Sequence, residues 1–470
     1  MAKKPSKTRK YVDMRYIMSP KSVAIIGASE KAGKVGNAIM QNYVDVGFQG
    51  RIYPININAE GSIMGYKAYR SILDVKRSID LVVISVPAKA VPGVMEECCK
   101  AGVKGIIIVS GGFAEVGEVE LQKRVYDIAQ KYNIPVLGPN CLGVMDTRSR
   151  NDTLFLPTFK IDRPKIGGVS FVSQSGSVGS STLDLISGEG FGLARFISYG
   201  NAVVIDEVDL LNYLAHDKYT KVIVFYIEGV KRGREFIELA KKVTRLKPVV
   251  ILKGGVTELG ASAAHSHTAS LAGSAQAYEA VFRQYGFIEA KNLEELLYFA
   301  KVFDTQPPSR GNRVAVITNG GGHGVLATDA LYLNGLVLPD ITAESKERLR
   351  KTMPKIVNIK MPLDIGGDAG EERFSAALDI LEDDPNIDSI MSITLFQTPG
   401  ADEKVADAII RHGTARKKPL VVVSTGSTYT KSHTSIIEGA GVPVYDSPDS
   451  AARALAALLW YSNYKNKVVE

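Results

Sequence analysis

The stretch SVAIIGASEKAGKVG, residues 22–36, decides the fold class of this chain. It opens with a short apolar run, passes through a glycine-rich turn and continues into residues typical of a helix. A buried strand followed by a tight turn and a helix is the opening of a parallel β-α-β unit. The stretch therefore predicts an α/β domain with a doubly wound sheet, because such units connect with right-handed crossovers.

The same rhythm returns along the whole chain in three blocks. The apolar runs expected to form strands are 22–27, 51–56, 81–86, 105–110 and 135–140 in the first block, 168–173, 194–200, 221–229 and 248–255 in the second, and 313–320, 389–396, 419–426 and 443–446 in the third. Glycines flank many of these runs and helical patterns separate them, which indicates buried parallel sheets.

Two breaks in composition separate the blocks. Residues 148–168 are polar and contain proline, and we expect a linker with a short irregular or edge segment there. Residues 304–313 contain two adjacent prolines, which is typical of a boundary. The sequence thus predicts three consecutive α/β domains, at 12–147, 160–303 and 312–465.

Composition excludes several classes of protein. The 470 residues are 45% hydrophobic and 23% charged, which suits ordinary buried cores. The net charge of +7 is interspersed rather than gathered in a stripe, so we expect anionic small ligands rather than nucleic acid. The sequence contains no apolar run long enough to predict a membrane span. Its basic start is not followed by the apolar region of a secretion signal. With only three cysteines, the chain is expected in the cytoplasm.

The glycine-rich turn of the first block predicts a site for a phosphate-bearing ligand. A turn of this kind offers free backbone N–H groups to an anion, although a tight turn of any doubly wound fold would look similar. The spacing of Gly27, Gly33 and Gly36 does not match GxGxxG, and Val35 follows Lys34 where a P-loop requires Ser or Thr. NAD and P-loop ATP are therefore disfavoured, and a ligand held by backbone amides and Lys34 remains.

The segment PNCLG, residues 139–143, closes the last predicted strand of the first block. It falls at the carboxyl edge of the sheet, where ligands of such folds bind. Cys141 is a weak candidate nucleophile, because nothing beside it in the sequence would lower the pKa of its thiol.

The second block carries the residues with the most chemistry. FVSQSGSVGSSTLD, residues 171–184, predicts a strand, a turn of small residues and a helix whose N-terminus faces an anion. The same residues would also suit an ordinary serine-rich N-cap. Glu228 ends the third strand of the block, where a carboxylate can hold an imidazole ring in one orientation, although a solvated turn residue is equally consistent.

Two of the six histidines stand in ASAAHSHTASLAGS, residues 261–274. The neighbouring residues are too small to pack around them, so we expect a mobile loop. An imidazole on such a loop suits a phosphoryl carrier that visits two places, and His267 is the candidate carrier. His265 is either a nearby donor or without a role. A solvated or capping histidine is the plainer alternative.

Taken together, these motifs resemble the alpha subunit of ADP-forming (NDP-forming) acyl-CoA synthetases, relatives of succinyl-CoA synthetase. The resemblance runs from about residue 12 to residue 465. The motifs that carry it are SHTASLAGS (266–274), GASEKAGKVG (27–36), YPININ (53–58), SQSGS (173–177), YIEG (226–229), TNGGGHGVLATDA (318–330) and MPLDIGGDA (361–369). Ala269, Ile57 and His323 depart from the usual Gly, Pro and Pro of that family.

The resemblance implies an N-terminal Rossmann-like domain that binds coenzyme A, followed by two flavodoxin-like domains. It implies that His267 is phosphorylated and that Glu228 supports its ring. Coenzyme A would be held by Gly27, Ala28, Ser29, Lys34, Val35, Gly36, Asn56, Asn58, Val86, Pro87, Asn140 and Cys141. The phosphate would be held at two helix N-termini, by Ser173, Gln174, Ser175, Gly176 and Ser177 and by Gly321, Gly322 and Gly324.

The resemblance also implies a partner. The three blocks leave no room for the ATP-grasp module that such a reaction needs, so a separate beta subunit would bind Mg²⁺ and ADP or ATP, in an α2β2 assembly. The implied reaction interconverts acyl-CoA, ADP and phosphate with a carboxylic acid, CoA and ATP, with acetate as the expected acid. No metal site is expected in this chain. The alternatives are an inactive CoA-binding regulatory or scaffold protein and an NAD-dependent dehydrogenase.

Overall fold

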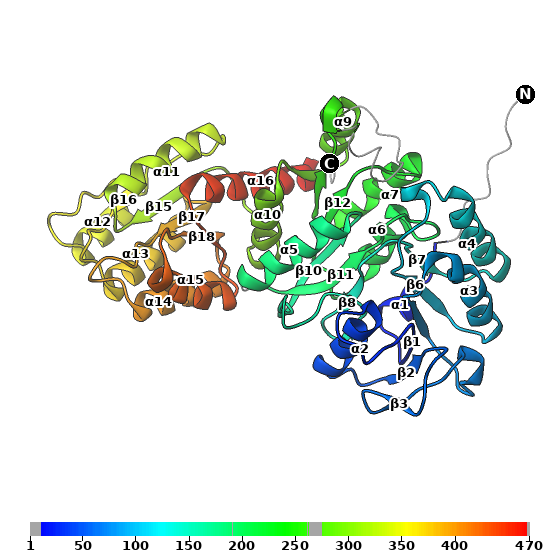
Figure 1. The fold of residues 1–470 in the computed structure, drawn as a ribbon. Helices are drawn as coiled ribbons and strands as arrows, with labels where there is room; N and C mark the ends of the chain where they lie inside the picture. Colours follow the sequence, from blue (N-terminus) through cyan, green and yellow to red (C-terminus); the bar gives the residue numbers. More distant parts are fainter. Residues whose placement is uncertain (1–10, 190, 261, 263–274, 468–470) are drawn as a thin grey trace, which may run out of the picture. The chain divides into compact units, whose positions relative to one another are not determined.

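The computed structural model describes residues 11–189, 191–260, 262 and 275–467. The chain forms two compact units (Figure 1). One consists of Met1–Ser187 with Leu193–Phe287, and the other of Gly188–Gly192 with Ile288–Glu470. The two N-terminal sheets lie in the first unit, apart from most of the edge strand β14, and the third sheet lies in the second unit. The two histidines of the predicted carrier loop, His265 and His267, fall outside the described residues.

The first sheet is parallel and has the order β2-β1-β5-β6-β7. Its strands are β1 (Ser22–Ile26), β2 (Arg51–Ile55), β5 (Leu81–Ile84), β6 (Gly105–Ile108) and β7 (Val136–Leu137). Its helices are α1 (Arg15–Met18), α2 (Val35–Asp45), α3 (Val91–Lys100) and α4 (Val119–Tyr132). Val23 and Ile25 of β1 pack with α2, whereas Ala24 and Ile26 pack with α3 and α4, so helices cover both faces (Figure 1). A small hairpin, β3 (Ser62–Ile63) and β4 (Tyr66–Lys67), follows β2.

The second sheet has the order β14-β13-β12-β10-β11-β8-β9. Its strands are β8 (Gly143–Asp146), β9 (Asn151–Asp152), β10 (Ile166–Ser173), β11 (Leu193–Ser198), β12 (Val222–Ile227), β13 (Val249–Lys253) and β14 (Phe287–Ala290). The helices that follow these strands are α5 (Gly176–Glu189), α6 (Glu207–His216), α7 (Gly233–Leu246), α9 (Ala275–Gln284) and α10 (Leu293–Thr305). The strands from β10 to β13 are parallel, while β8 and β9 form an antiparallel edge next to β11.

The third sheet is parallel and has the order β16-β15-β17-β18-β19. Its strands are β15 (Val314–Thr318), β16 (Leu363–Asp364), β17 (Ser389–Ile393), β18 (Leu420–Val423) and β19 (Val444–Tyr445). Its helices are α11 (Gly321–Leu333), α12 (Ala343–Thr352), α13 (Glu371–Asp383), α14 (Glu403–Ala415), α15 (Thr428–Gly439) and α16 (Pro448–Lys467).

The three sheets share one strand order. Leaving aside the antiparallel edge of the second sheet, each runs 2-1-3-4-5 in chain order, which is the doubly wound order of flavodoxin-like folds. The connections reverse direction between the first and third strands of each sheet. Ligands of such folds bind outside the carboxyl ends of the strands at this point. The shared order therefore marks three switch points, at β1/β5, at β10/β12 and at β15/β17.

The strands agree closely with the apolar runs of the sequence, and every run overlaps one observed strand. The strands β8, β14 and β16 and the hairpin of β3 and β4 lie outside these runs, while β9 lies within residues 148–168, where an irregular or edge segment was expected. Among the described residues, no helix is long and apolar enough to cross a membrane.

Candidate active site

The switch point of the second sheet brings together residues that are far apart in the sequence. Gln174 follows β10 and Glu228 follows β12, the two strands that flank this point. The Gln174 Oε1 atom accepts hydrogen bonds from the backbone N–H groups of Glu228 at 2.7 Å and Gly229 at 3.2 Å. The side chain of Gln174 thus ties the two strand ends together and is itself only 7% exposed. The predicted turn and the predicted glutamate are neighbours.

The serines before α5 divide into two kinds. Ser173 and Ser175 are buried, and the Ser173 hydroxyl donates to the Ser175 carbonyl at 2.6 Å, which fixes the shape of the turn. The Ser175 and Ser177 hydroxyls lie 3.1 Å apart, and Ser177 is exposed. An anion at the start of α5 therefore has the first backbone N–H groups of the helix and the Ser177 hydroxyl as accessible donors.

The carboxyl group of Glu228 lies in a buried, tyrosine-lined surrounding. Glu228 is 6% exposed, and the Tyr226 hydroxyl donates to its Oε1 atom at 3.5 Å. Burial, with the nearby Glu228 carboxylate, raises the pKa of Tyr226 to about 12, so Tyr226 remains a donor at neutral pH. Such a carboxylate is suited to accept a proton from an imidazole and to hold that ring.

One further acid, Glu207, and one further base, Lys253, lie in this region. The sequence alone did not single them out. Glu207, the first residue of α6, is fully buried and accepts a hydrogen bond from the buried Tyr199 at 3.3 Å. Burial and the neighbouring Asp206 raise the pKa of Glu207 to about 7. Lys253 ends β13 and is 5% exposed. The only signal of Lys253 in the sequence is a charged residue at the end of an apolar run.

Most of the predicted coenzyme A residues follow β1, β2 and β5 around the switch point of the first sheet, whereas Asn140 and Cys141 follow the edge strand β7. Gly27 and Ala28 follow β1, and the Asn56 amide at the end of β2 donates to the Ala28 carbonyl at 2.8 Å. Gly27 has a φ of +94°, and a Cβ atom on it would approach the Ser85 carbonyl oxygen, just after β5, to 2.7 Å. A Cβ atom on Gly36 would collide with the Gly27 carbonyl. Both glycines are thus required for the close packing of α2 on the turn.

The exposure of these residues differs in an informative way. Lys34, Val35, Asn58, Pro87 and Asn140 are exposed, and no side chain caps the N-terminus of α2. Ser29, Asn56 and Val86 are half-buried. An uncapped helix start beside an exposed lysine fits the diphosphate of a nucleotide-like ligand. Whether these residues contact coenzyme A remains a prediction.

Cys141 follows the edge strand β7 and is buried. Its side chain is 3% exposed and its thiol donates to the Ile108 carbonyl at 3.4 Å. Burial raises the pKa of the Cys141 thiol to about 12, which agrees with the expectation that it is not a nucleophile. The thiol is directed to the backbone of β6 rather than to the surface.

The third switch point holds the glycines expected at the second phosphate-binding helix. Gly320 is the N-cap of α11 and provides no side-chain cap. Gly321 and Gly322 are exposed, whereas Gly324 is buried. A Cβ atom on Gly324 would lie 3.2 Å from Thr318 and 3.3 Å from Pro362, so this glycine serves packing. His323 is half-buried in the first turn of the helix. Because α11 lies in the second compact unit, its place near the first phosphate site stays a prediction.

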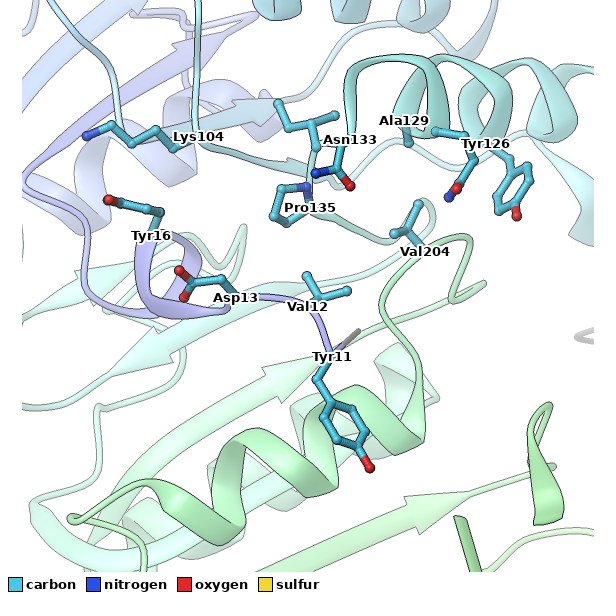
Figure 2. Close-up of a pocket in the computed structure, with 12 residues that line it drawn as sticks. Tyr11, Val12, Asp13, Tyr16, Lys104, Tyr126, Ala129, Asn133, Pro135 and Val204 are labelled. Carbon is cyan, nitrogen blue, oxygen red and sulfur yellow. The ribbon is translucent and has the colours of Figure 1, made fainter. Parts of the chain in front are cut away.

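A separate cleft of about 440 Å³ lies at the opposite edge of the first sheet (Figure 2). Lys104 and Pro135, which precede β6 and β7, line it together with Tyr16 and Asp13. Lys104 is paired with Asp80 at 2.6 Å, and Asp13 with Arg15 at 2.7 Å. The charges that line this cleft are therefore already compensated. Within the described part of the chain, no group of three or more His, Cys, Asp or Glu side chains could hold a metal ion.

Comparison with known families assigns a domain description to each of the three sheets. Residues 21–147 match a CoA binding domain, residues 166–303 a succinyl-CoA ligase like flavodoxin domain, and residues 314–459 a Ligase-CoA domain.

Several proteins are similar to this chain in sequence or in structure. The chain is 43% identical over 459 residues to the ADP-forming acetate–CoA ligase of Methanocaldococcus jannaschii, covering 97% of this chain and 64% of that protein. It is 39% identical over 464 residues to the alpha subunit of ADP-forming acetate–CoA ligase I of Pyrococcus furiosus, covering 97% and 99%. The dinucleotide forming acetyl-coenzyme A synthetase 1 of Candidatus Korarchaeum cryptofilum, solved in complex with phosphate and ADP, superposes with a TM-score of 0.90 at 35% identity, covering 97% of this chain and 99% of that one. The chain belongs to the family of ADP-forming acid–CoA ligases, in which it corresponds to the alpha subunit.

Proposed function

We propose that this chain is the alpha subunit of an ADP-forming acyl-CoA synthetase that uses acetate or a similar small carboxylic acid. In one direction the enzyme converts acyl-CoA, ADP and phosphate into the carboxylic acid, CoA and ATP. The observation that carries the proposal is the switch point of the second sheet, where Gln174 holds the ends of β10 and β12 together beside a buried carboxylate, Glu228.

The first step makes an acyl phosphate. An oxygen of inorganic phosphate attacks the thioester carbonyl of acyl-CoA, the C–S bond breaks, and CoA leaves as a thiol after taking a proton. The N-terminus of α5 and the Ser177 hydroxyl bind the phosphate, which spreads its negative charge over fixed donors. The loop after β1, with Lys34 and the start of α2, holds the diphosphate of coenzyme A.

The second step moves the phosphoryl group to His267. A ring nitrogen attacks phosphorus, the bond to the acyl oxygen breaks, and the free carboxylate leaves. Glu228 accepts the hydrogen bond of the other ring nitrogen and so stabilises the positive charge that develops on the ring. The Tyr226 hydroxyl, which donates to Glu228, keeps this carboxylate in place.

The third step takes place on a partner. An ADP β-phosphate oxygen attacks the phosphohistidine and gives ATP with restored His267. We propose that an ATP-grasp beta subunit binds Mg²⁺ and the nucleotide, in an α2β2 heterotetramer. Two facts support a partner: the P. furiosus relative is named an alpha subunit, and the chain covers only 64% of the longer M. jannaschii protein.

The test is phosphoenzyme formation from acetyl phosphate, which needs no partner. The full chain is incubated with ³²P-labelled acetyl phosphate, and label that is stable in base and labile in acid is counted. The matched variants are His267→Ala and His265→Ala. We expect label on the wild type and on His265→Ala and none on His267→Ala. Label that persists on His267→Ala would contradict the assignment, and CoA binding without any label would favour the inactive regulatory protein.

A further inference from the structure

Two lysines of this chain are almost equally buried but differ in their partners. Lys301 is 4% exposed and contacts the carboxylates of Glu438 at 2.8 Å and Glu189 at 3.1 Å. Lys253 is 5% exposed, and among the described residues no carboxylate lies within ion-pair distance of its ammonium group. Its polar contact is the carbonyl of the next residue, Gly254, and its cation lies 5.0 Å from the centre of the Tyr278 ring.

The pKa values of the two lysines reflect this difference. Burial acts to lower the pKa of Lys301, but the carboxylates of Glu438 and Glu189 raise it above its usual value. Burial lowers the pKa of Lys253, and the more distant Glu228 carboxylate opposes this only in part. An ammonium ion buried without a paired anion costs free energy, so buried charges in proteins are normally paired. A bound anion would therefore stabilise the buried ammonium group of Lys253.

The position of Lys253 shows where that charge would lie. Lys253 is the last residue of β13, which pairs with β12, and the register sets Ile227 beside Lys253. Glu228 follows directly, and β10 with its phosphate-ready turn is the next strand beyond β12. Neighbouring strands are about 4.8 Å apart, so the turn before α5 begins about 10 Å from the backbone of Lys253. A lysine side chain spans most of that distance.

We propose that Lys253 is a phosphoryl-binding residue, which supplies the positive charge for the phosphate at the carboxyl edge of the second sheet. The ligand class is a dianionic phosphoryl group, as inorganic phosphate, acyl phosphate or phosphohistidine. A dianion is favoured over the single charge of a carboxylic acid, because two negative charges interact more strongly with a buried cation than one does. The proposal rests on the proposed function for the identity of the reaction but concerns only phosphate binding.

A purely structural role makes different predictions. If Lys253 only held the Gly254 carbonyl and the Tyr278 ring, its replacement would change stability and leave the affinity for phosphate unchanged. Lys247 provides the matched comparison. It lies just before the other end of β13, is half-buried, has a pKa lowered by burial, and donates to the backbone carbonyls of Leu214 at 2.8 Å and Asp217 at 2.7 Å.

The experiment is calorimetric titration of the full chain with inorganic phosphate at pH 7 and, in a second arm, with acetate. The variants are Lys253→Met, Lys253→Arg and Lys247→Met. We expect Lys253→Met to weaken phosphate binding by about ten-fold or more, because a charge-assisted contact is lost. Lys253→Arg should retain most of the affinity and Lys247→Met all of it. An unchanged affinity in folded Lys253→Met, a wild type that does not bind phosphate, or an effect on acetate alone would overturn the proposal.

A second measurement applies if Lys253→Met does not fold. The chain is labelled with ¹³C at lysine Cε, and the lysine signals are followed by NMR during addition of phosphate. We expect the phosphate-sensitive signal to be the one that Lys253→Arg lacks. The proposal is overturned if that signal is still present in Lys253→Arg.

The two proposals fail in different ways. If phosphate binding depends on Lys253 but no phosphoenzyme forms from acetyl phosphate, the proposed function is wrong and the phosphate site stands. If His267 is phosphorylated normally while the affinity for phosphate is unchanged in Lys253→Met, the proposed role of Lys253 is wrong and the proposed function stands.

Discussion

At the scale of single residues, the second sheet buries three titratable side chains near its carboxyl edge. Glu207, Glu228 and Lys253 are all less than one tenth exposed. Each of them follows or ends a strand or begins a helix. Burial of this kind costs stability and is typical of functional sites.

Glu207 makes the stability of the first unit depend on pH. Burial, with Asp206, raises the pKa of Glu207 from 4.5 in the unfolded chain to about 7. Between these values the folded chain holds a proton that the unfolded chain has lost, so stability falls as the pH rises through this window. Two and a half pKa units correspond to about 3 kcal/mol. Glu207→Gln cannot ionise and keeps an oxygen for the Tyr199 hydroxyl. Its free energy of unfolding relative to the wild type should therefore increase by about this amount between pH 4.5 and pH 8.

Urea unfolding at a series of pH values checks this prediction. The control is Glu235→Gln, an exposed carboxylate on α7, whose difference from the wild type should hardly change with pH. A Glu207→Gln difference that is flat across the same range would show that Glu207 is ionised throughout in the folded chain.

The residue scale also shows what sequence reasoning cannot reach. The candidate role of Glu228 was accessible from its position after an apolar run. The hydrogen bond from its backbone to Gln174 spans 54 positions of sequence and becomes visible only when β10 and β12 pair. Lys253 was missed because its lack of a carboxylate partner within the described part of the chain is a property of three-dimensional packing and leaves no mark in the sequence.

At the scale of elements, the first helix after β1 depends on a contact between two glycines. The carbonyl of Gly27 occupies the space where a side chain on Gly36 would begin. Gly36→Ala must push the start of α2 away from the turn. Because this helix start is the proposed diphosphate site, we expect coenzyme A affinity to fall by about ten-fold or more, as for loss of a charge-assisted contact.

Coenzyme A titration of Gly36→Ala and Gly93→Ala checks this expectation. Gly93 lies in α3, and an added Cβ atom there meets no atom within 4 Å. Gly93→Ala should bind coenzyme A as the wild type does. Equal affinities for wild type and Gly36→Ala would exclude the start of α2 from the coenzyme A site.

The elements themselves follow from the sequence to different degrees. Apolar runs such as 81–86 and 221–229 were long enough to identify buried strands. In contrast, β16 and β9 lie outside these apolar runs, whereas β7 and β19 also have only two residues each but fall within runs. β8 was hidden because Gly143 was assigned to the end of the first sheet, whereas it begins an antiparallel strand of the second.

At the scale of the whole molecule, the chain is divided into two compact units, and their stabilities should be separable. Lys301 stabilises the second unit through Glu438 and Glu189. Lys301→Met leaves these acids without a cation, which should cost about 3 kcal/mol. The loss should appear as faster amide exchange in β17 and β18 and not in β1 or β10.

Hydrogen exchange followed by mass spectrometry measures both units in one sample. Lys351→Met, which removes an exposed lysine of α12, serves as the control and should alter neither unit. If Lys301→Met accelerates exchange equally in β1 and β17, the two units unfold as one and the division is incorrect.

The order of the three sheets gives the chain three switch points, each a candidate ligand site. Each sheet repeats the order 2-1-3-4-5, and each switch point carries a glycine- or serine-rich turn before a helix. The sequence predicted this architecture because the three blocks share one rhythm. It could not predict the grouping into two units, which depends on contacts between sheets.

The central claim is that the switch point of the second sheet transfers a phosphoryl group with the help of Glu228. The most direct measurement is the rate of phosphoenzyme formation from acetyl phosphate in Glu228→Gln, with Glu235→Gln as the control and coenzyme A affinity measured in parallel. The account predicts a rate lower by about ten-fold or more with coenzyme A affinity unchanged. A Glu228→Gln chain that is phosphorylated as fast as the wild type would contradict it.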